Sequence, residues 1–260
     1  MSLRQQLRTN ALVRFFYFHW IAFRQFVNLN LPGYFLASLW YWKDFIRLKT
    51  MKGNPNFKDG LAFSYPCLTD RTESTPIEPV YFFQDAWAAR KIFEIKPATL
   101  YDIGSSVKTM SIIAQTIPVI FVDIRRIDVK LDGLTFLEGD ITKLPFANDS
   151  IDCISSLCVV EHIGLGRYGD PLDNWGSEKA VTELRRVLAP GGFVLFSVPV
   201  DRQNQVHYNA NRAFSRDYVL KLFEGLTLKE ERYIYGYELL NDYDPMKGAG
   251  TGLFLFQKPR

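Results

Sequence analysis

The second half of the chain alternates between short apolar runs and helical patterns, and this alternation constrains the fold more than any other feature. Apolar runs predict strands at residues 98–103, 118–124, 134–140, 151–160 and 193–199. Helical patterns lie between or after them, at 107–116, 177–190 and 215–226. Strands that alternate with helices form a mostly parallel sheet with helices on both faces.

We therefore expect an α/β fold with a doubly wound, mostly parallel, seven-stranded Rossmann-like sheet. Two late runs, 227–239 and 251–258, predict an antiparallel closing strand pair at the edge. The expected domains are an N-terminal extension at 1–60, a connector with a helix at 61–97, and the α/β domain at 98–260.

The N-terminal extension is basic and aromatic. Residues 1–60 carry nine Lys or Arg against two Asp, whereas the remaining residues have a net charge of −4. Aromatic rings and basic residues together favour a helical extension that contacts a membrane surface. Packing on protein is the alternative, and a spanning helix in the charge-free window 25–42 is a weaker one. Nucleic acid is disfavoured, because the segment offers apolar bulk rather than a polar basic stripe.

Cysteine and histidine usage points to a reducing compartment without a metal site. No CxxC pair occurs among the three cysteines, Cys67, Cys153 and Cys158. Cys153 and Cys158 are expected to be inert core residues. None of the three histidines, His19, His162 and His207, stands at metal-ligand spacing from another. With no signal-peptide pattern at the start, we expect a cytoplasmic protein.

Acidic residues end or follow four successive predicted strands, at Asp102, Asp123, Asp140 and Glu161. Ligands of such sheets bind outside the carboxyl ends of the strands. Asp123 follows Asp102 by 21 residues, a spacing that suits a carboxylate bonded to the hydroxyls of a ribose.

The loop "DIGSS" has one glycine, Gly104, where phosphate-binding loops carry several. Ser105 and Ser106 replace the rest of a GxGxxG, so a pyrophosphate cradle is poorly supported. An acidic strand end would also repel phosphates. The pattern therefore favours a nucleoside without phosphates, and S-adenosylmethionine is such a ligand.

Five segments in order carry a family resemblance: "YDIGSS", "VDI", "GDITKLPFANDSID", "SSLCVVEHIG" and "ELRRVLAPGGFVLFSVP". They resemble the signature segments of class I S-adenosylmethionine-dependent methyltransferases of the type 11-like kind. The resemblance covers residues 98 to about 235 and implies S-adenosylmethionine as the cofactor. It departs from the family in the loop, where further glycines are common.

The resemblance implies a role for each matching position. Asp102 and Gly104, with Ser105 beside them, would line the methionine moiety, and Asp123 would hold the ribose. Asp140 and Ile141 would contact the adenine edge. A helix before the first strand covers the cofactor in many such enzymes, which makes Tyr81, Gln84 and Asp85 candidate contacts.

Three further segments, "YFFQDAWAARKIF", "EHIGLGRYGDPLD" and "HYNANRAFS", resemble an uncharacterised branch of this superfamily. Its members often accompany genes of surface-glycan assembly. This narrower resemblance implies a sugar or glycan as the acceptor of the methyl group.

Two histidines, His162 and His207, are candidate bases, although each can equally be a structural residue. The glycine-rich loop 163–176 is a candidate substrate lid, or else a solvated insertion. Candidate substrate contacts lie on both sides of this region: Glu161, Arg167, Tyr168, Asp170, Tyr208, Asn209 and Arg212.

The leading hypothesis is a methyltransferase acting on a hydroxyl of a sugar, glycan or lipid-linked acceptor at the inner face of a membrane. One alternative is a catalytically silent scaffold that binds S-adenosylmethionine. Another is a methyltransferase of small molecules or quinone-type lipids. A second copy of the chain is a candidate partner. DNA is not, because Glu-His follows the fourth strand in place of an Asn/Asp-Pro-Pro-aromatic segment.

Overall fold

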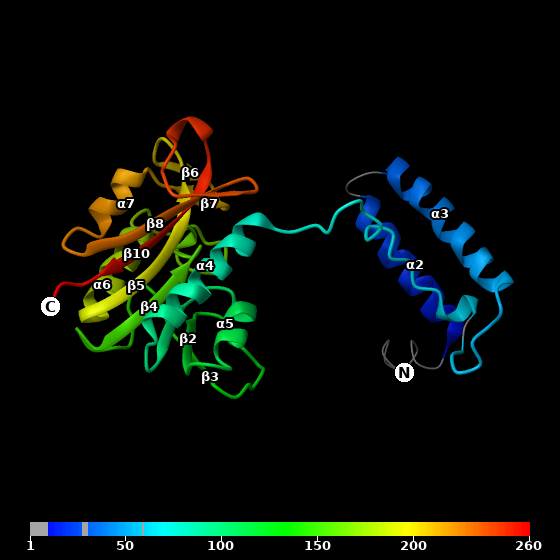
Figure 1. Cartoon of the computed structure of the whole chain (residues 1–260), viewed down its shortest axis with the longest axis horizontal. Coiled ribbons are helices and arrows are strands. Elements are labelled where there is room, and N and C mark those ends of the chain that lie inside the picture. The colour runs from blue at the N-terminus through cyan, green and yellow to red at the C-terminus, as the bar shows by residue number, and fades with distance from the viewer. Residues whose placement is uncertain (1–9, 28–30, 59) are drawn as a thin grey trace. The chain divides into compact units, whose positions relative to one another are not determined.

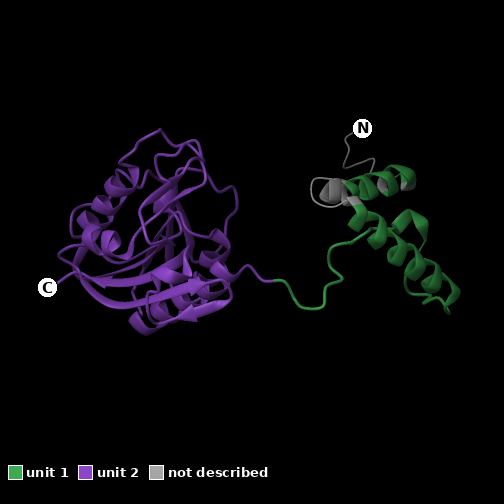
Figure 2. Cartoon of the chain, turned by 90° about the horizontal axis from the view of Figure 1, so that it is seen from above, with its two compact units in different colours: residues 1–76 green, residues 77–260 purple. Residues whose placement is uncertain are grey.

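A computed structural model describes residues 10–27, 31–58 and 60–260. The chain forms two compact units, Met1–Pro76 and Ile77–Arg260 (Figure 2). This division differs from the expected boundaries at 60 and 97, because residues 61–76 group with the N-terminal helices. The helix that follows them groups with the sheet.

The first unit contains two helices, α2 (Ala11–Val27) and α3 (Leu31–Thr50), and the short 3-10 helix η1 (Leu61–Phe63). A small aromatic cluster joins these elements. The His19 ring stacks on Trp42 with 5.6 Å between ring centroids, and Ser64 Oγ lies 2.5 Å from Tyr41 Oη and 3.3 Å from His19 Nε2. Among the described residues, no helix combines the length and hydropathy that crossing a bilayer requires.

The second unit is built on an eight-stranded sheet with the order β3-β2-β1-β4-β5-β10-β8-β9. Five strands are parallel: β1 (Leu100–Ile103), β2 (Val119–Asp123), β3 (Leu134–Glu138), β4 (Ile151–Leu157) and β5 (Leu188–Val200). β10 (Gly250–Gln257) runs antiparallel to β5 and to β8 (Thr227–Tyr235). The α/β fold with its antiparallel closing strand is thus confirmed.

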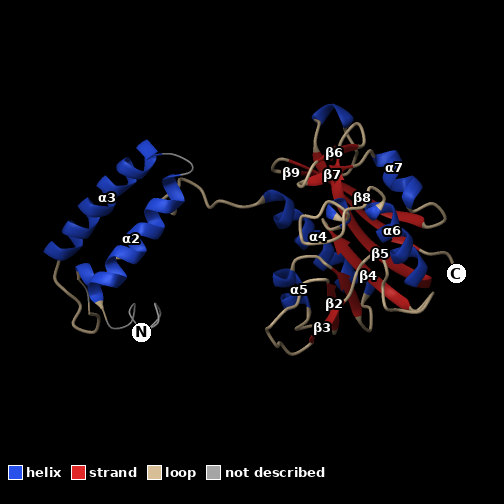
Figure 3. Ribbon diagram, turned by 180° about the vertical axis from the view of Figure 1, so that it is seen from behind, coloured by secondary structure: helices blue, strands red, loops and turns tan. Residues whose placement is uncertain are grey.

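Helices cover both faces of this sheet (Figures 1 and 3). One face packs against α4 (Pro79–Ile95) and α5 (Val107–Ile113), the other against α6 (Gly176–Val187) and α7 (Arg216–Leu222). Neighbouring residues of β10 pack into the hydrophobic clusters on opposite faces of the sheet, because successive side chains of a strand point to opposite faces. Phe254 packs on the α6 side, and Leu255 packs on the α4 side.

Local sequence explains where these helices begin and end. The carboxylate of Glu78 accepts a hydrogen bond from Tyr81 N at the start of α4, next to Pro79. Lys96 ends α4 in a left-handed conformation, with φ of 53°. Ser215 caps α7, as its position before the helical pattern predicts.

Three features differ from the expectation. β9 (Glu238–Leu240) adds an eighth strand at the edge, and β6 (Gln205–His207) pairs with β7 (Asn211–Ala213) in a separate hairpin. The helix predicted to extend to 190 ends at Val187, and "LAPGG" already belongs to β5. A register shift against β4 accommodates these residues, because Pro190 cannot continue a helix.

The strand order reverses beside β1. The chain passes from β1 outward to β2 and β3 and then returns to place β4 on the other side of β1. The loops after β1 and β4 therefore diverge at the carboxyl edge, where a ligand can enter between them.

Candidate functional site

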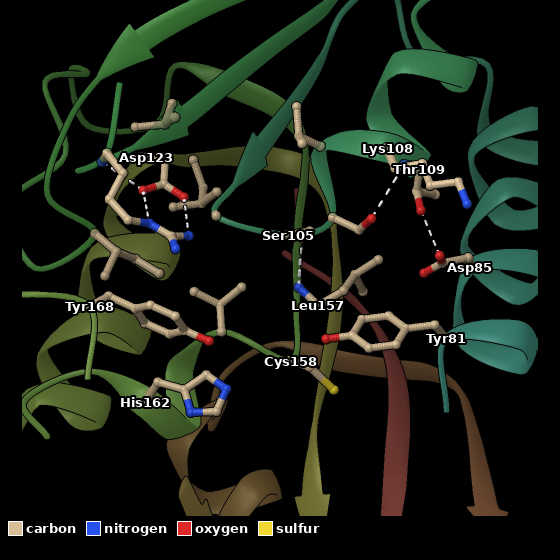
Figure 4. A pocket seen from close by; sticks show the side chains of 18 of the residues that line it. Tyr81, Asp85, Ser105, Lys108, Thr109, Asp123, Leu157, Cys158, His162 and Tyr168 are labelled. Carbon is tan, nitrogen blue, oxygen red and sulfur yellow. Dashed lines mark hydrogen bonds and ion pairs between the residues drawn. The ribbon is translucent and has the colours of Figure 1, made fainter. Parts of the chain in front are cut away.

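A pocket of about 1060 Å³ lies at this reversal point (Figure 4). Its walls come from α4, the loop after β1, the ends of β2 and β4, and the loop after the 3-10 helix η2 (Val160–His162). All lining residues belong to the second unit.

The loop after β1 holds its shape with serine side chains. Gly104 has φ of 74°, and a Cβ there would lie 3.0 Å from Val159 Cγ1, which explains the glycine. Ser105 Oγ accepts a hydrogen bond of 3.0 Å from the backbone N–H of Leu157 at the end of β4 (Figure 4). Ser106 caps α5 through Thr109 N. The two serines thus fix the loop to its neighbours.

Asp102 is fully buried and does not line the pocket. Its carboxylate accepts hydrogen bonds from Ser155 Oγ at 2.5 Å and from Ser105 N at 3.0 Å. Burial raises the pKa of Asp102 to about 7, although both hydrogen bonds act in the opposite direction. Asp102 therefore links β1, the loop after β1 and β4 through hydrogen bonds. It does not itself face a ligand in the pocket.

Asp123 ends β2 and lines the pocket with a side chain that is 10% exposed. Arg125 N donates to Oδ1 at 2.7 Å, Nε donates to Oδ1 at 3.2 Å, and Nη2 donates to Oδ2 at 3.1 Å. The guanidinium lies 4.4 Å from the ring centroid of Tyr168. Asp123 thus faces the pocket beside the guanidinium of Arg125, which stacks on Tyr168 in the loop after η2.

The turn after β3 supplies a third acidic group. Asp140 is exposed at the pocket, and its Oδ1 accepts hydrogen bonds of 2.8 Å from both Thr142 N and Thr142 Oγ1. Ile141 is buried next to it and also lines the pocket. The structure thus brings together the expected positions on β2 and after β3.

Helix α4 forms one wall and is anchored firmly. Gln84 is buried outside the pocket lining, where its Oε1 accepts hydrogen bonds from Ser197 Oγ at 2.6 Å and Cys158 Sγ at 3.0 Å. Asp85 accepts a hydrogen bond of 2.5 Å from Thr109 Oγ1 of α5. Tyr81, half exposed, does line the pocket.

Cys158 lies at the pocket rather than in the core, where it was expected. It lies just beyond β4 with φ of 53°, and it lines the pocket. Burial raises the pKa of its thiol well above the ordinary range, so the sulfur is a neutral surface rather than a nucleophile. Cys153, in contrast, is buried in the core as expected.

His162 also lines the pocket. Its Nδ1 lies 2.7 Å from Ala210 O, and a carbonyl oxygen only accepts, so Nδ1 carries the hydrogen. Burial lowers the pKa of His162, which makes the ring neutral at neutral pH with a free lone pair on Nε2. Glu161 is buried and does not line the pocket, and its Oε1 lies 3.6 Å from Nε2 of His162.

The loop after η2 has a fixed conformation. Asp170 Oδ2 accepts from Gly164 N at 2.6 Å and Gly166 N at 3.4 Å, which closes the loop on a carboxylate. Arg212 is buried and donates to Ile163 O at 2.5 Å and to Asp173 O at 3.0 Å, at the two ends of the loop. Arg212 therefore positions the loop and does not line the pocket.

Other predicted substrate residues lie at the rim or away from the pocket. Arg167 donates to Ala210 O at 2.9 Å and lies 5.2 Å from the ring centroid of Tyr168. His207, Tyr208 and Asn209 are exposed on the β6–β7 hairpin and do not line the pocket. The hairpin reaches the site through the Ala210 carbonyl, which fixes His162.

The pocket also contains two cationic residues that were not predicted from the sequence. Arg125 and Lys108 are its two cationic lining residues. Five carboxylates also line it: Glu78, Asp85, Asp123, Asp140 and Asp170. Arg125 stands two residues after Asp123, where an Asx-type turn with a charged side chain is a recognisable signal. Nothing in the local sequence marks Lys108.

Known proteins share the architecture of this chain. A protein from Galdieria sulphuraria, described as a candidate sarcosine dimethylglycine methyltransferase, matches 68% of the chain at 15% identity, with a TM-score of 0.52 and 86% of that protein covered. The cyclase SpnF matches 66% of the chain at 13% identity, with a TM-score of 0.50 and 82% of SpnF covered. The fold is shared. Because the descriptions name different reactions, the activity must be argued from the site.

In sequence, residues 136–243 match the family described as Caenorhabditis protein of unknown function, DUF268. This match spans less than half of the chain, from β3 to the segment after β9. No curated protein matches the chain in sequence.

Proposed function

We propose that the protein is an S-adenosylmethionine-dependent methyltransferase whose cofactor occupies the pocket at the β1–β4 reversal. The charge of the lining carries this proposal: five carboxylates against two cationic side chains, beside a single-glycine loop. Such a lining attracts a cationic nucleoside and repels a pyrophosphate.

The residues present fit this cofactor. Asp123 faces the pocket, and an ionised carboxylate offers about four lone-pair sites, so ribose hydroxyls can bind beside the Arg125 donors. Gly104 leaves room for the methionine moiety. Asp140 and Ile141 are available to the adenine edge. The cofactor supplies a sulfonium-bound methyl group that a nucleophile displaces in line.

We further propose that the acceptor presents a hydroxyl, as a sugar, glycan or lipid-linked compound does. His162 Nε2 is a neutral base in the pocket, positioned by Ala210 O, and it can take the hydroxyl proton during transfer. The hydroxyl groups of Tyr81 and Tyr168 point toward one another across the pocket (Figure 4). Aromatic faces and phenol hydroxyls together suit a polyhydroxylated ring.

Two experiments test the activity. In a thermal-shift panel, S-adenosylmethionine and S-adenosylhomocysteine should raise Tm, whereas NAD and ATP should leave it unchanged. Stabilisation by NAD or ATP alone would contradict the charge argument. An isotope-labelled methyl donor should then label hydroxylated sugar or lipid-linked acceptors. Cofactor binding without transfer to any acceptor would favour a silent scaffold.

We also propose that the N-terminal unit contacts an anionic membrane surface. Exposed apolar residues at helical spacing mark α2 at Leu12, Phe16 and Trp20, and α3 carries exposed Phe35, Leu36, Leu39 and Ile46. Basic residues stand near the end of α3, at Lys43, Arg47 and Lys49. Apolar burial and attraction to anionic lipid would act together there.

Co-sedimentation of the full chain with vesicles tests the membrane proposal. The protein should pellet with phosphatidylglycerol-containing vesicles and less with phosphatidylcholine alone. The Phe16→Glu/Leu39→Glu variant should lose most of this binding. The matched variant Val129→Glu/Tyr237→Glu changes two exposed side chains of the second unit and should retain it. Equal loss in both variants, or no binding by the wild type, would overturn the membrane proposal.

A further inference from the structure

Glu161 is a buried carboxyl group with an unpaired oxygen. The side chain is 2% exposed, and within the described part of the chain its Oε2 has no hydrogen-bond partner. The turn that carries it is held in place, because Ser177 Oγ of α6 donates to Val160 O at 2.7 Å. A carboxylate that is ionised, buried and unpaired is strongly unfavourable.

The groups around Glu161 offer little compensation for a negative charge. Tyr81 of α4 and Cys158 after β4 are neutral, since burial raises the pKa of each. Arg167, on the loop, directs its guanidinium to Ala210 O at 2.9 Å. Among the described residues, His162 is the one cationic candidate recorded within ion-pair distance of Glu161.

The geometry of the Glu161–His162 pair is that of two neutral groups. Oε1 and Nε2 are 3.6 Å apart, whereas a charge-assisted N–H···O bond is usually about 2.7–2.9 Å long. Burial raises the pKa of Glu161 to about 8, against the opposing effects of a hydrogen bond from its own backbone, a hydrogen bond from the Cys158 thiol and, smallest of the three, the charge of Arg167. Burial and Arg167 both lower the pKa of His162, while Asp170 and the Ala210 carbonyl act the other way.

We propose that Glu161 is held as a neutral carboxylic acid and thereby leaves Nε2 of His162 unprotonated, ready to accept a proton in the pocket. Glu161 is a positioning residue, because it acts through His162 and does not line the pocket. This inference deepens the proposed function and rests on it for its catalytic meaning.

The proton balance of the reaction follows from this arrangement. As the acceptor oxygen bonds to the methyl carbon and the carbon–sulfur bond of the donor breaks, the hydroxyl proton moves to Nε2. The imidazolium keeps its Nδ1–H bond to Ala210 O. After the product leaves, Nε2 returns the proton to water. An ionised Glu161 would instead hold a proton on His162 and block the first step.

Nitrogen-15 NMR of the histidine rings tests the inference directly in the full chain without cofactor or acceptor. Only three histidines are present, so His19→Gln and His207→Gln variants assign the His162 signals. At pH 7 we expect the neutral Nδ1–H tautomer of His162. A doubly protonated ring at pH 7 would overturn the inference, and this result needs no variant of Glu161.

The variant Glu161→Gln separates a neutral acid from a carboxylate. Glutamine imitates the neutral acid, so the titration midpoint of His162 should move by less than about 0.5 pH unit. A fall of about one unit or more would mean that a negative charge had been removed, and would contradict the inference. Arg167→Gln is the positive control, because loss of its charge should raise the midpoint.

These readouts do not depend on methyl transfer. If the protein binds no S-adenosylhomocysteine but His162 titrates as expected, the proposed function fails and the state of the pair stands. If cofactor binds and His162 is doubly protonated at pH 7, the inference that Glu161 and His162 are both neutral is wrong, and the proposed cofactor site stands.

Discussion

At the loop after β1, the side chain of Ser105 makes a structural hydrogen bond that glycine could not make. The backbone N–H of Ser105 donates a hydrogen bond to the Asp102 carboxylate, and Ser105 Oγ accepts a hydrogen bond from the backbone N–H of Leu157. A glycine would leave that second N–H without a partner. The departure from a glycine-rich loop is therefore compatible with an intact pocket.

Ser105→Gly should destabilise the protein by about 1–2 kcal/mol, because it leaves the buried N–H of Leu157 unpaired and adds backbone freedom. Ser106→Gly is the matched control, since replacing a helix cap by glycine usually costs only a few tenths of a kcal/mol. Equilibrium urea denaturation measures both. An equal cost for the two variants would contradict the role given to Ser105.

Asp102 should make stability depend on pH. Its folded-state pKa of about 7 lies above the ordinary value of 3.8. The stability from the neutral acid is therefore fully present below pH 3.8 and is lost as pH rises through about 7. Relative to Asp102→Asn, the wild type should lose up to about 1.4 kcal/mol per pH unit within this window. Denaturation of both proteins from pH 5 to 8.5 tests this, and a constant difference would refute it.

The loop after η2 is fixed by residues distant in sequence, which distinguishes it from an independently mobile lid. Arg212 of β7 joins the carbonyls of Ile163 and Asp173, and Asp170 closes the glycine turns from within. Tyr168 is thereby presented to Arg125. The cavity wall depends on this element keeping its shape.

Arg212→Met should loosen this loop, because methionine fills similar space without donating to the two carbonyls. We expect amide hydrogen exchange in residues 163–173 to accelerate at least about tenfold, and stability to fall by about 2–3 kcal/mol. Arg202→Met, on an exposed turn, should change neither. Unchanged exchange in the loop of Arg212→Met would show that other contacts hold it.

Most elements of the second unit follow from local patterns. Alternating apolar runs predicted β1 to β5, and capping residues such as Ser215 marked helix starts. The β6–β7 hairpin and β9 were missed because each of these strands has only three residues, too few for an apolar period to mark it. Residues 188–190 were assigned to the preceding helix because the start of β5 is set by its pairing with β4, which the local sequence does not show.

At the scale of the whole molecule, the sequence located the site better than it assigned side-chain roles. Of the four acidic residues at the strand ends, Asp123 and Asp140 line the pocket. Asp102 turns inward, where it accepts a hydrogen bond from Ser155, 53 residues away. Arg212 and Gln84 likewise serve as internal anchors. Such roles depend on long-range contacts, which local patterns do not contain.

The central claim is that Asp123 and its surroundings bind the nucleoside of S-adenosylmethionine. Isothermal titration of the full chain with S-adenosylhomocysteine tests it most directly, with Asp123→Ala and the companion variant Arg125→Gln. The wild type should bind one equivalent. Asp123→Ala should bind roughly 10- to 150-fold more weakly, from loss of about 1.5–3 kcal/mol of hydrogen bonding. Arg125→Gln should bind at least as tightly as the wild type. No binding by the folded wild type, or equal affinity in Asp123→Ala, would contradict the account.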